Sequence, residues 1–134
     1  DTSALFALLN RADGNHHAAA ATWEGLLADE ADLRTSNYVI LEGVATVQRR
    51  LGVGAARDLL LDLASILSVH WVGPDVHEPA AVRLLAAGRR DLSLVDCVSF
   101  GLMRREGIET AFTFDSHFAE QGFECVPVVQ TEAG

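Results

Sequence analysis

The sequence predicts an α/β fold in one domain, with a parallel sheet covered by helices on both faces. Short apolar runs alternate along the chain with longer segments whose apolar residues recur every three or four positions. This alternation is typical of parallel strands joined by crossover helices. The chain has 134 residues, of which 49% are hydrophobic and 22% charged, so one compact core is expected rather than disorder.

The first part of the chain is predicted to form two helices and a short strand. Residues 2–10 carry leucines at helical spacing, and the DGN turn at 13–15 supplies a cap for a helix over 16–28. A strand is expected at about 31–35. These elements begin the alternation.

Two longer helices are predicted next. Ser36 or Asn37 begins a helix that runs to about Leu51 and ends at Gly52, and a leucine-rich helix follows at 54–67. In the first of these helices, valine and isoleucine recur at helical spacing, so one of its faces is expected to be buried.

The second half of the chain repeats the pattern of a strand followed by a helix. The run SVHWV at 68–72 predicts a strand, and the turn at 73–75 opens a helix to about Ala87. Ser93 is the expected N-cap of a helix that ends at Gly107. A strand, a short helix and a strand complete the chain, over 109–114, 116–121 and 124–129.

The charge and composition narrow the possible functions. The formal net charge is −9 and all ten basic residues are arginine, which argues against broad electrostatic adhesion to nucleic acid but permits local contact. No apolar run approaches the ~18 residues of a membrane span, and the acidic start is a poor signal peptide. Cys97 and Cys125 form no C-x-x-C pair, so a reducing cytoplasm is expected.

Four acidic residues lie in apolar surroundings rather than in solvated charge runs. Asp1 precedes an apolar helix, Glu42 lies within a helix, Asp96 lies in the first turn of a helix and Asp115 ends a strand. Each also has a simpler interpretation. Asp1 could be an exposed terminus or an N-cap, and Asp115 could cap the helix that follows it. Glu42 could lie on a solvated helix face, and Asp96 could be an acid that the helix dipole favours. In an α/β sheet, however, strand carboxyl ends and the helix N-termini that follow them converge at one edge, where ligands bind.

Carboxylates that converge in this way repel one another and are stabilised by a hard cation. Two unit charges 4 Å apart cost about 4 kcal/mol at an effective dielectric near 20. Oxygen ligands favour Mg²⁺ or Mn²⁺, as one ion or two. Such ions activate water and stabilise charge on a transferring phosphate, so hydrolysis of a phosphodiester is the predicted chemistry.

Four segments in this order resemble the motifs of PIN domains, and most closely the VapC toxins of bacterial toxin–antitoxin pairs. The segments are DTSALFALL at 1–9, SNYVILEGVATVQRRLG at 36–52, LSLVDCVSFGLMRREGI at 92–108 and AFTFDSHFAEQGF at 111–123. The resemblance implies a three-layer α/β/α sandwich with a parallel central sheet and a Mg²⁺- or Mn²⁺-dependent endoribonuclease. It assigns the catalytic and metal-binding acids to Asp1, Glu42, Asp96 and Asp115, with supporting hydroxyl groups on Ser3 and Thr113.

Two departures from the family pattern are visible. In PIN domains the first Asp ends a central strand, so we expect residues 1–134 to be a single PIN-like domain whose first strand lies upstream of Asp1. Some members also carry an acid two residues after the last Asp, where this chain has His117. That histidine is expected at the surface or in helix packing, with assistance to a metal or contact with phosphate as the alternative.

The remaining expectations concern partners. Seven arginines are candidates for RNA contacts, with solvated surface as the simpler interpretation of each. Arg89 and Arg90 precede the Asp96 helix, and the others lie at positions 11, 49, 50, 104 and 105. The RNA would be single-stranded or looped, and the resemblance suggests tRNA. It also implies an antitoxin that covers the acidic pocket and lays an apolar helix on the domain, where leucines such as those at 59, 60 and 63 would be exposed. The same leucines are candidates for a homodimer contact, although such residues more often form core. A phosphate-accepting receiver module is disfavoured because the chain has no Lys. A non-catalytic PIN-like module that binds RNA or protein is the alternative function.

Overall fold

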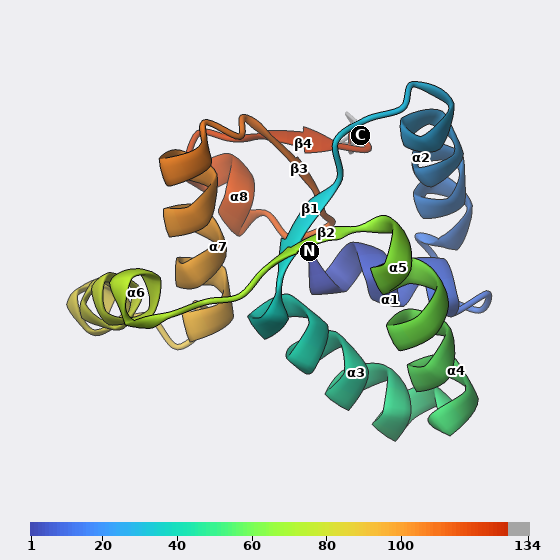
Figure 1. Ribbon diagram of the computed structural model, residues 1–134, viewed down its shortest axis with the longest axis horizontal. Coiled ribbons are helices and arrows are strands. Elements are labelled where there is room, and N and C mark those ends of the chain that lie inside the picture. Colours follow the sequence, from blue (N-terminus) through green and yellow to red (C-terminus); the bar gives the residue numbers. More distant parts are fainter. Residues whose placement is uncertain (129–134) are drawn as a thin grey trace, which may run out of the picture.

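The computed structural model describes residues 1–128 (Figure 1). The helices are α1 (Thr2–Leu9), α2 (His16–Ala28), α3 (Asn37–Leu51), α4 (Val53–Arg57), the π-helix η1 (Asp58–Leu63), α5 (Ala64–Ile66), α6 (Pro74–Ala87), α7 (Leu94–Glu106) and α8 (His117–Glu120). The strands are β1 (Arg34–Ser36), β2 (Ser68–His70), β3 (Thr110–Phe112) and β4 (Glu124–Val126). Within this described part, no helix has the length and apolar character needed to cross a membrane.

The strands form two parallel pairs. β1 pairs with β2 and β3 pairs with β4, with Thr35 opposite Val69 and Ala111 opposite Cys125 at the centres of the two ladders. The parallel direction confirms the prediction. Within residues 1–128 the two pairs are separate two-stranded sheets, with no backbone ladder joining them.

The elements follow the predicted order, and their ends differ locally. The strand expected at 31–35 lies at Arg34–Ser36, because Ser36 is both its last residue and the N-cap of α3, where its Oγ accepts the Val39 N–H at 3.2 Å. The helix predicted at 54–67 is a succession of α4, η1 and α5. The strand predicted at 124–129 ends at Val126, and residue 129 lies outside the described residues.

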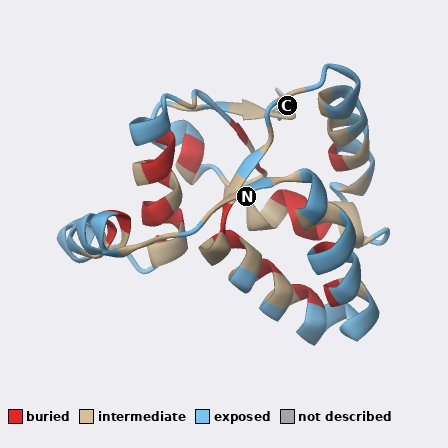
Figure 2. Cartoon of the chain, viewed as in Figure 1, coloured by how far each residue is buried: buried red, intermediate tan, exposed pale blue. Residues whose placement is uncertain are grey.

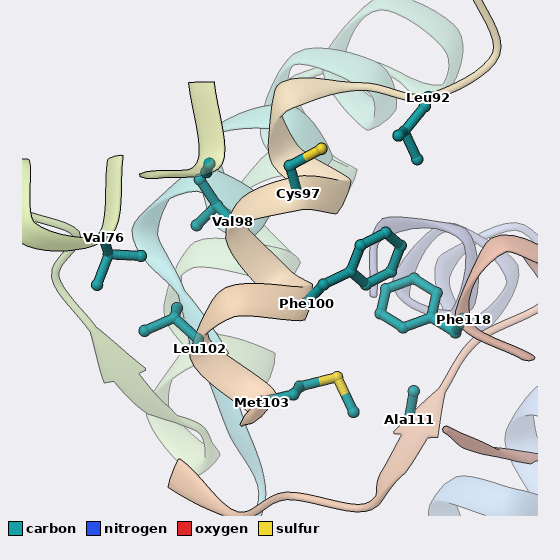
Figure 3. Close-up of a cluster of buried hydrophobic side chains, with 10 residues drawn as sticks. Val76, Leu92, Cys97, Val98, Phe100, Leu102, Met103, Ala111 and Phe118 are labelled. Carbon is teal, nitrogen blue, oxygen red and sulfur yellow. The ribbon is translucent and has the colours of Figure 1, made fainter. Parts of the chain in front are cut away.

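Two hydrophobic clusters hold the helices in place, and Figure 2 shows their buried residues on the inner faces of α1, α3 and α7. In one cluster, α1 packs on α3 and η1 through Leu5, Val47 and Leu59. In the other, α7 packs on α6 and α8. There the Phe100 and Phe118 rings meet edge to face with centroids 5.0 Å apart (Figure 3). These clusters fix the starts of α1 and α7, which carry two of the predicted acids.

A cavity of about 760 Å³ lies between the two strand pairs. Residues of β1, β2 and β3 line it, together with apolar residues from five helices. Those residues are Leu5 of α1, Trp23 and Leu26 of α2, Val39 of α3, Leu102 and Met103 of α7, and Phe118 of α8. The separation of the two sheets therefore coincides with a large apolar hollow in the middle of the domain.

Candidate active site

The four predicted acids line one pocket of about 410 Å³. Asp1 precedes α1, Glu42 lies on α3, Asp96 lies in the first turn of α7, and Asp115 follows β3. The structure thus brings together side chains that are far apart in the sequence. Their convergence follows from the parallel strand direction and from the packing of α1, α3 and α7, as the edge of an α/β sheet requires.

Asp96 is held in place by a reciprocal cap at the start of α7. The Ser93 Oγ accepts the Asp96 N–H at 3.0 Å, and Asp96 Oδ2 accepts the Ser93 N–H at 3.2 Å. The residue is only 8% exposed. Burial raises the pKa of the Asp96 carboxyl, the Ser93 hydrogen bonds oppose this, and the Asp115 charge raises it further. The capping role was the simpler interpretation of Asp96, and the residue fulfils it while also lining the pocket.

Asp115 leaves β3 and turns the chain into α8. Its N–H donates to the Thr113 Oγ1 at 2.9 Å, and its Oδ1 accepts the His117 N–H at 2.9 Å. These two bonds fix the carboxylate at the mouth of the strand. As with Asp96, the local cap and the pocket position are compatible, because a carboxylate oxygen has lone pairs for both.

Two hydroxyl groups orient the Asp1 carboxylate. Its Oδ2 accepts hydrogen bonds from Ser3 Oγ and from Thr113 Oγ1, both at 2.8 Å. The Ser3 hydroxyl also accepts the Phe114 N–H at 3.0 Å, so it connects α1 to the loop after β3. Thr113 is 1% exposed. Ser3 and Thr113 therefore lie where the sequence predicted supporting polar groups, one bond from the first acid.

The opposite wall of the pocket is formed by α3. Glu42 is half-buried there, and Arg50, further along the same helix, also lines the pocket. The Arg50 guanidinium lies over the Phe6 ring, 4.4 Å from its centroid. Across residues 1–128, no arginine forms an ion pair with any of the four acids. The acidic cluster is therefore not neutralised by the chain's own arginines.

His117 lies at the site, where sequence reasoning favoured a surface or packing role. Its Nδ1 is 2.9 Å from Asp115 Oδ1 and 3.7 Å from Asp96 Oδ2, and its Nε2 is 3.1 Å from Asp91 Oδ2. The hydrogen bond with Asp91 and the Asp115 charge raise the pKa of His117 against the opposing effect of burial. The available signal was its position two residues after Asp115.

Asp91 lies in the loop before α7, beside Arg89 and Arg90, which were candidates for RNA contact. Arg89 donates to both Asp91 oxygens and to Glu120 Oε2. Neither arginine lines the acidic pocket, and Arg90 is exposed. The role of the two arginines in RNA contact stays a prediction.

The donor set fits a divalent cation. One ligand atom from each of Asp96, Asp115 and His117 lies within 4.8 Å of the other two. Carboxylate oxygens and an imidazole nitrogen are ligands for hard and borderline divalent ions. Within the described chain, His117 Nδ1 is also buried without a hydrogen-bond partner, so a cation there would satisfy an otherwise unpaired polar atom.

The fold and the acidic site together are those of a PIN domain. The chain matches the PIN domain family over residues 1–124 and belongs to it. It is 35% identical over 124 residues to the 23S rRNA-specific endonuclease VapC20 of Mycobacterium tuberculosis, in strains H37Rv and CDC 1551, with 92% of each chain covered.

A solved structure agrees with this assignment. The crystal structure of Mycobacterium tuberculosis VapC20, described as a Sarcin-Ricin loop cleaving toxin, matches with a TM-score of 0.79 and 35% identity, covering 91% of this chain and 92% of that chain. The predicted PIN-like α/β fold and the resemblance to VapC toxins are therefore confirmed. The class of activity predicted from the sequence is the one that these relatives carry.

Proposed function

We propose that this protein is a metal-dependent endoribonuclease and the toxin of a toxin–antitoxin pair. The observation that carries the proposal is the single pocket lined by Asp1, Glu42, Asp96 and Asp115, which no arginine in residues 1–128 neutralises. Acids gathered in this way are stable when they share a cation. The similarity to endonucleases over 92% of the chain supports the same conclusion.

The positions of the pocket residues suggest a separate role for each. Asp96 and Asp115 lie close enough to hold one Mg²⁺ or Mn²⁺. Asp1 and Glu42 line the same pocket outside that close group. They would bind a second metal ion or orient a water molecule. When bound, the ion lowers the pKa of a coordinated water and stabilises negative charge on the phosphate. Ser3 and Thr113 keep the Asp1 carboxylate in one orientation through their hydrogen bonds.

The RNA substrate is proposed to be a structured ribosomal loop rather than tRNA. The named target of the similar VapC20 proteins is 23S rRNA, and a loop presents unpaired nucleotides that a pocket can reach. Because the net charge is −9, contact with phosphate is expected to be local. Arg50 is the arginine best placed for it, since it lines the acidic pocket.

The partners follow from the same proposal. An antitoxin would insert an arginine among the pocket acids and cover an apolar surface nearby. Leu60, Leu61 and Ile66 of η1 and α5 are 49%, 65% and 50% exposed and offer such a surface to an antitoxin or to a second copy in a homodimer. Leu59, which the sequence grouped with Leu60, is fully buried. A ribosomal substrate would place the protein in the cytoplasm.

The deciding experiment is cleavage of a sarcin–ricin stem-loop RNA and of a tRNA by purified protein with Mn²⁺ or Mg²⁺. We expect the wild-type protein to cleave the stem-loop and the Asp96→Asn variant to lose activity by at least about 100-fold. Asp62→Asn, which removes an exposed carboxylate outside the pocket, is the matched control and should keep full activity. Equal cleavage by wild type and Asp96→Asn would reject the catalytic assignment. RNA binding without cleavage would support the non-catalytic alternative.

A further inference from the structure

We propose that His117 Nδ1 is a direct metal ligand beside Asp96 and Asp115, and that it shifts the preference of the site from Mg²⁺ toward Mn²⁺. The inference rests on the proposed function, because it concerns the same cation. It adds a nitrogen ligand to a set of acids. The two ring nitrogens of His117 have unequal surroundings.

The Nε2 atom has a partner and the Nδ1 atom does not. Nε2 is hydrogen-bonded to Asp91 Oδ2 at 3.1 Å, so it carries the proton when the ring is neutral. Nδ1 then directs a lone pair toward Asp115 Oδ1, 2.9 Å away, and toward Asp96 Oδ2, 3.7 Å away. Among residues 1–128 it forms no hydrogen bond. A lone pair that faces two carboxylates is stabilised by a cation between them.

The spacing of these atoms suits a shared ion. Two ligand atoms at right angles around an ion, each about 2.1 Å from it, lie about 3.0 Å apart. The 2.9 Å separation of His117 Nδ1 and Asp115 Oδ1 is close to this value. His117 and Asp115 are therefore spaced to be neighbouring ligands of one ion, and the Asp96 carboxylate, whose Oδ2 is 3.7 Å from Nδ1, would have to approach to join them.

A second layer of contacts holds the imidazole ring in this orientation. Metal-binding histidines commonly donate their other ring N–H to a carboxylate, and Asp91 occupies that position. Arg89 fixes Asp91 in turn, with Nε at 3.0 Å from Oδ1 and one terminal nitrogen at 2.8 Å from Oδ2. Its other terminal nitrogen is 2.9 Å from Glu120 Oε2 on α8, the helix that begins with His117. Asp91 and Arg89 are thus positioning residues in this scheme.

A nitrogen ligand changes which ions the site prefers. Mg²⁺ is a hard cation that takes oxygen ligands and retains water, whereas first-row transition ions accept imidazole readily. An all-carboxylate pocket would bind the two ions through similar contacts. The presence of His117 is expected to favour Mn²⁺ over Mg²⁺.

The rival role for His117 is that of an internal cation that offsets the acids. The two roles predict opposite effects of His117→Gln. If the ring is a ligand, the variant binds Mn²⁺ at least about 10-fold more weakly, and its Mn²⁺/Mg²⁺ affinity ratio falls. If the ring is only a counter-ion, its removal leaves the acids more negative, and Mn²⁺ binds as tightly as before or more tightly.

The experiment combines calorimetric titration with Mn²⁺ and Mg²⁺ and pulsed electron paramagnetic resonance of bound Mn²⁺. Wild type should show modulation from a coordinated ¹⁴N nucleus, and His117→Gln should lose it. His17→Gln, at an exposed histidine on α2, is the matched control and should keep it. Asp91→Asn should weaken Mn²⁺ binding while retaining the ¹⁴N signal, because it disturbs the orientation of the ring and not the ligand.

Bound Mn²⁺ without a ¹⁴N signal in wild type would overturn this inference. If the wild-type protein lacks the ¹⁴N signal but still cleaves RNA in a metal-dependent way, the proposed function stands and only the assignment of His117 as a ligand fails. Unchanged or tighter Mn²⁺ binding in His117→Gln would overturn it equally. Loss of all metal binding in wild type would instead reject the proposed function.

Discussion

Replacing Asp96 by Asn should make the metal-free protein more stable. The Asp96 carboxylate has a ligand oxygen within 4.8 Å of one from Asp115, and two full charges at that distance repel by about 3 kcal/mol at an effective dielectric near 20. His117 offsets part of this repulsion. The asparagine oxygen can still accept the Ser93 N–H, so the helix cap survives. We expect a net gain of about 1–2 kcal/mol, or about 4–8 °C in melting temperature.

The stability difference between wild type and Asp96→Asn should change with pH in one direction. Burial, together with the Asp115 charge, raises the pKa of Asp96 in the folded state above its value of about 3.9 in the unfolded chain. Between these two values the folded state binds more protons, so the stability of the wild type increases as the pH falls through that window. Asp96→Asn lacks this gain. The advantage of the variant should therefore be full at pH 7 and shrink toward pH 4.

The assay is thermal unfolding followed by circular dichroism, with a chelator present, at several pH values from 4 to 7. Wild type, Asp96→Asn and the exposed-carboxylate control Asp62→Asn should be compared at equal ionic strength. The control should track the wild type throughout. A lower melting temperature for Asp96→Asn at pH 7, or an advantage that grows as the pH falls, would refute the view that these acids repel one another.

Three other perturbations test separate parts of the structure. Saturating Mn²⁺ at about 100 times its dissociation constant should stabilise the wild type by about 2.7 kcal/mol in a thermal shift assay; no shift would contradict a metal site. Arg50→Ala should weaken RNA binding and reduce the salt dependence of that binding, and it should leave Mn²⁺ binding unchanged. Arg49 is exposed on the same helix, and Arg49→Ala should affect RNA binding less. Leu59→Ala should cost about 2–5 kcal/mol in chemical unfolding, whereas Leu60→Ala, 49% exposed, should cost under about 0.5 kcal/mol; similar costs would contradict the packing of η1.

The sequence was sufficient to predict the order of the elements and the convergence of four acids in one pocket, because both leave local signals. The N-caps at Ser36 and Ser93 and the leucine spacing mark the ends and faces of the helices. Asp96 and Asp115 stand out because an acid amid apolar residues is costly without a partner. Parallel strand direction then dictates that these acids meet at one edge.

What the sequence could not predict depends on contacts between distant segments. The ion pairs from Arg89 to Asp91 and Glu120 connect residues up to 31 positions apart, and nothing local marks them. Asp91 resembles any loop acid until the fold places it against His117. Arg50 was one of seven arginines that the sequence offered for RNA contact, and only the fold shows that it lines the acidic pocket.

The electrostatics of the site connect metal binding to the fold itself. Asp1 links α1 to the loop after β3 through the Ser3 and Thr113 hydroxyls, and Asp96 caps α7, so two of the acids that repel one another also hold elements together. The structure cannot relieve the repulsion by moving these side chains apart without breaking those bonds. A cation bound among these acids relieves the repulsion without moving them. Metal binding should therefore act as a fold-stabilising step, and an antitoxin arginine inserted in the same pocket would stabilise the toxin by the same mechanism while excluding the ion.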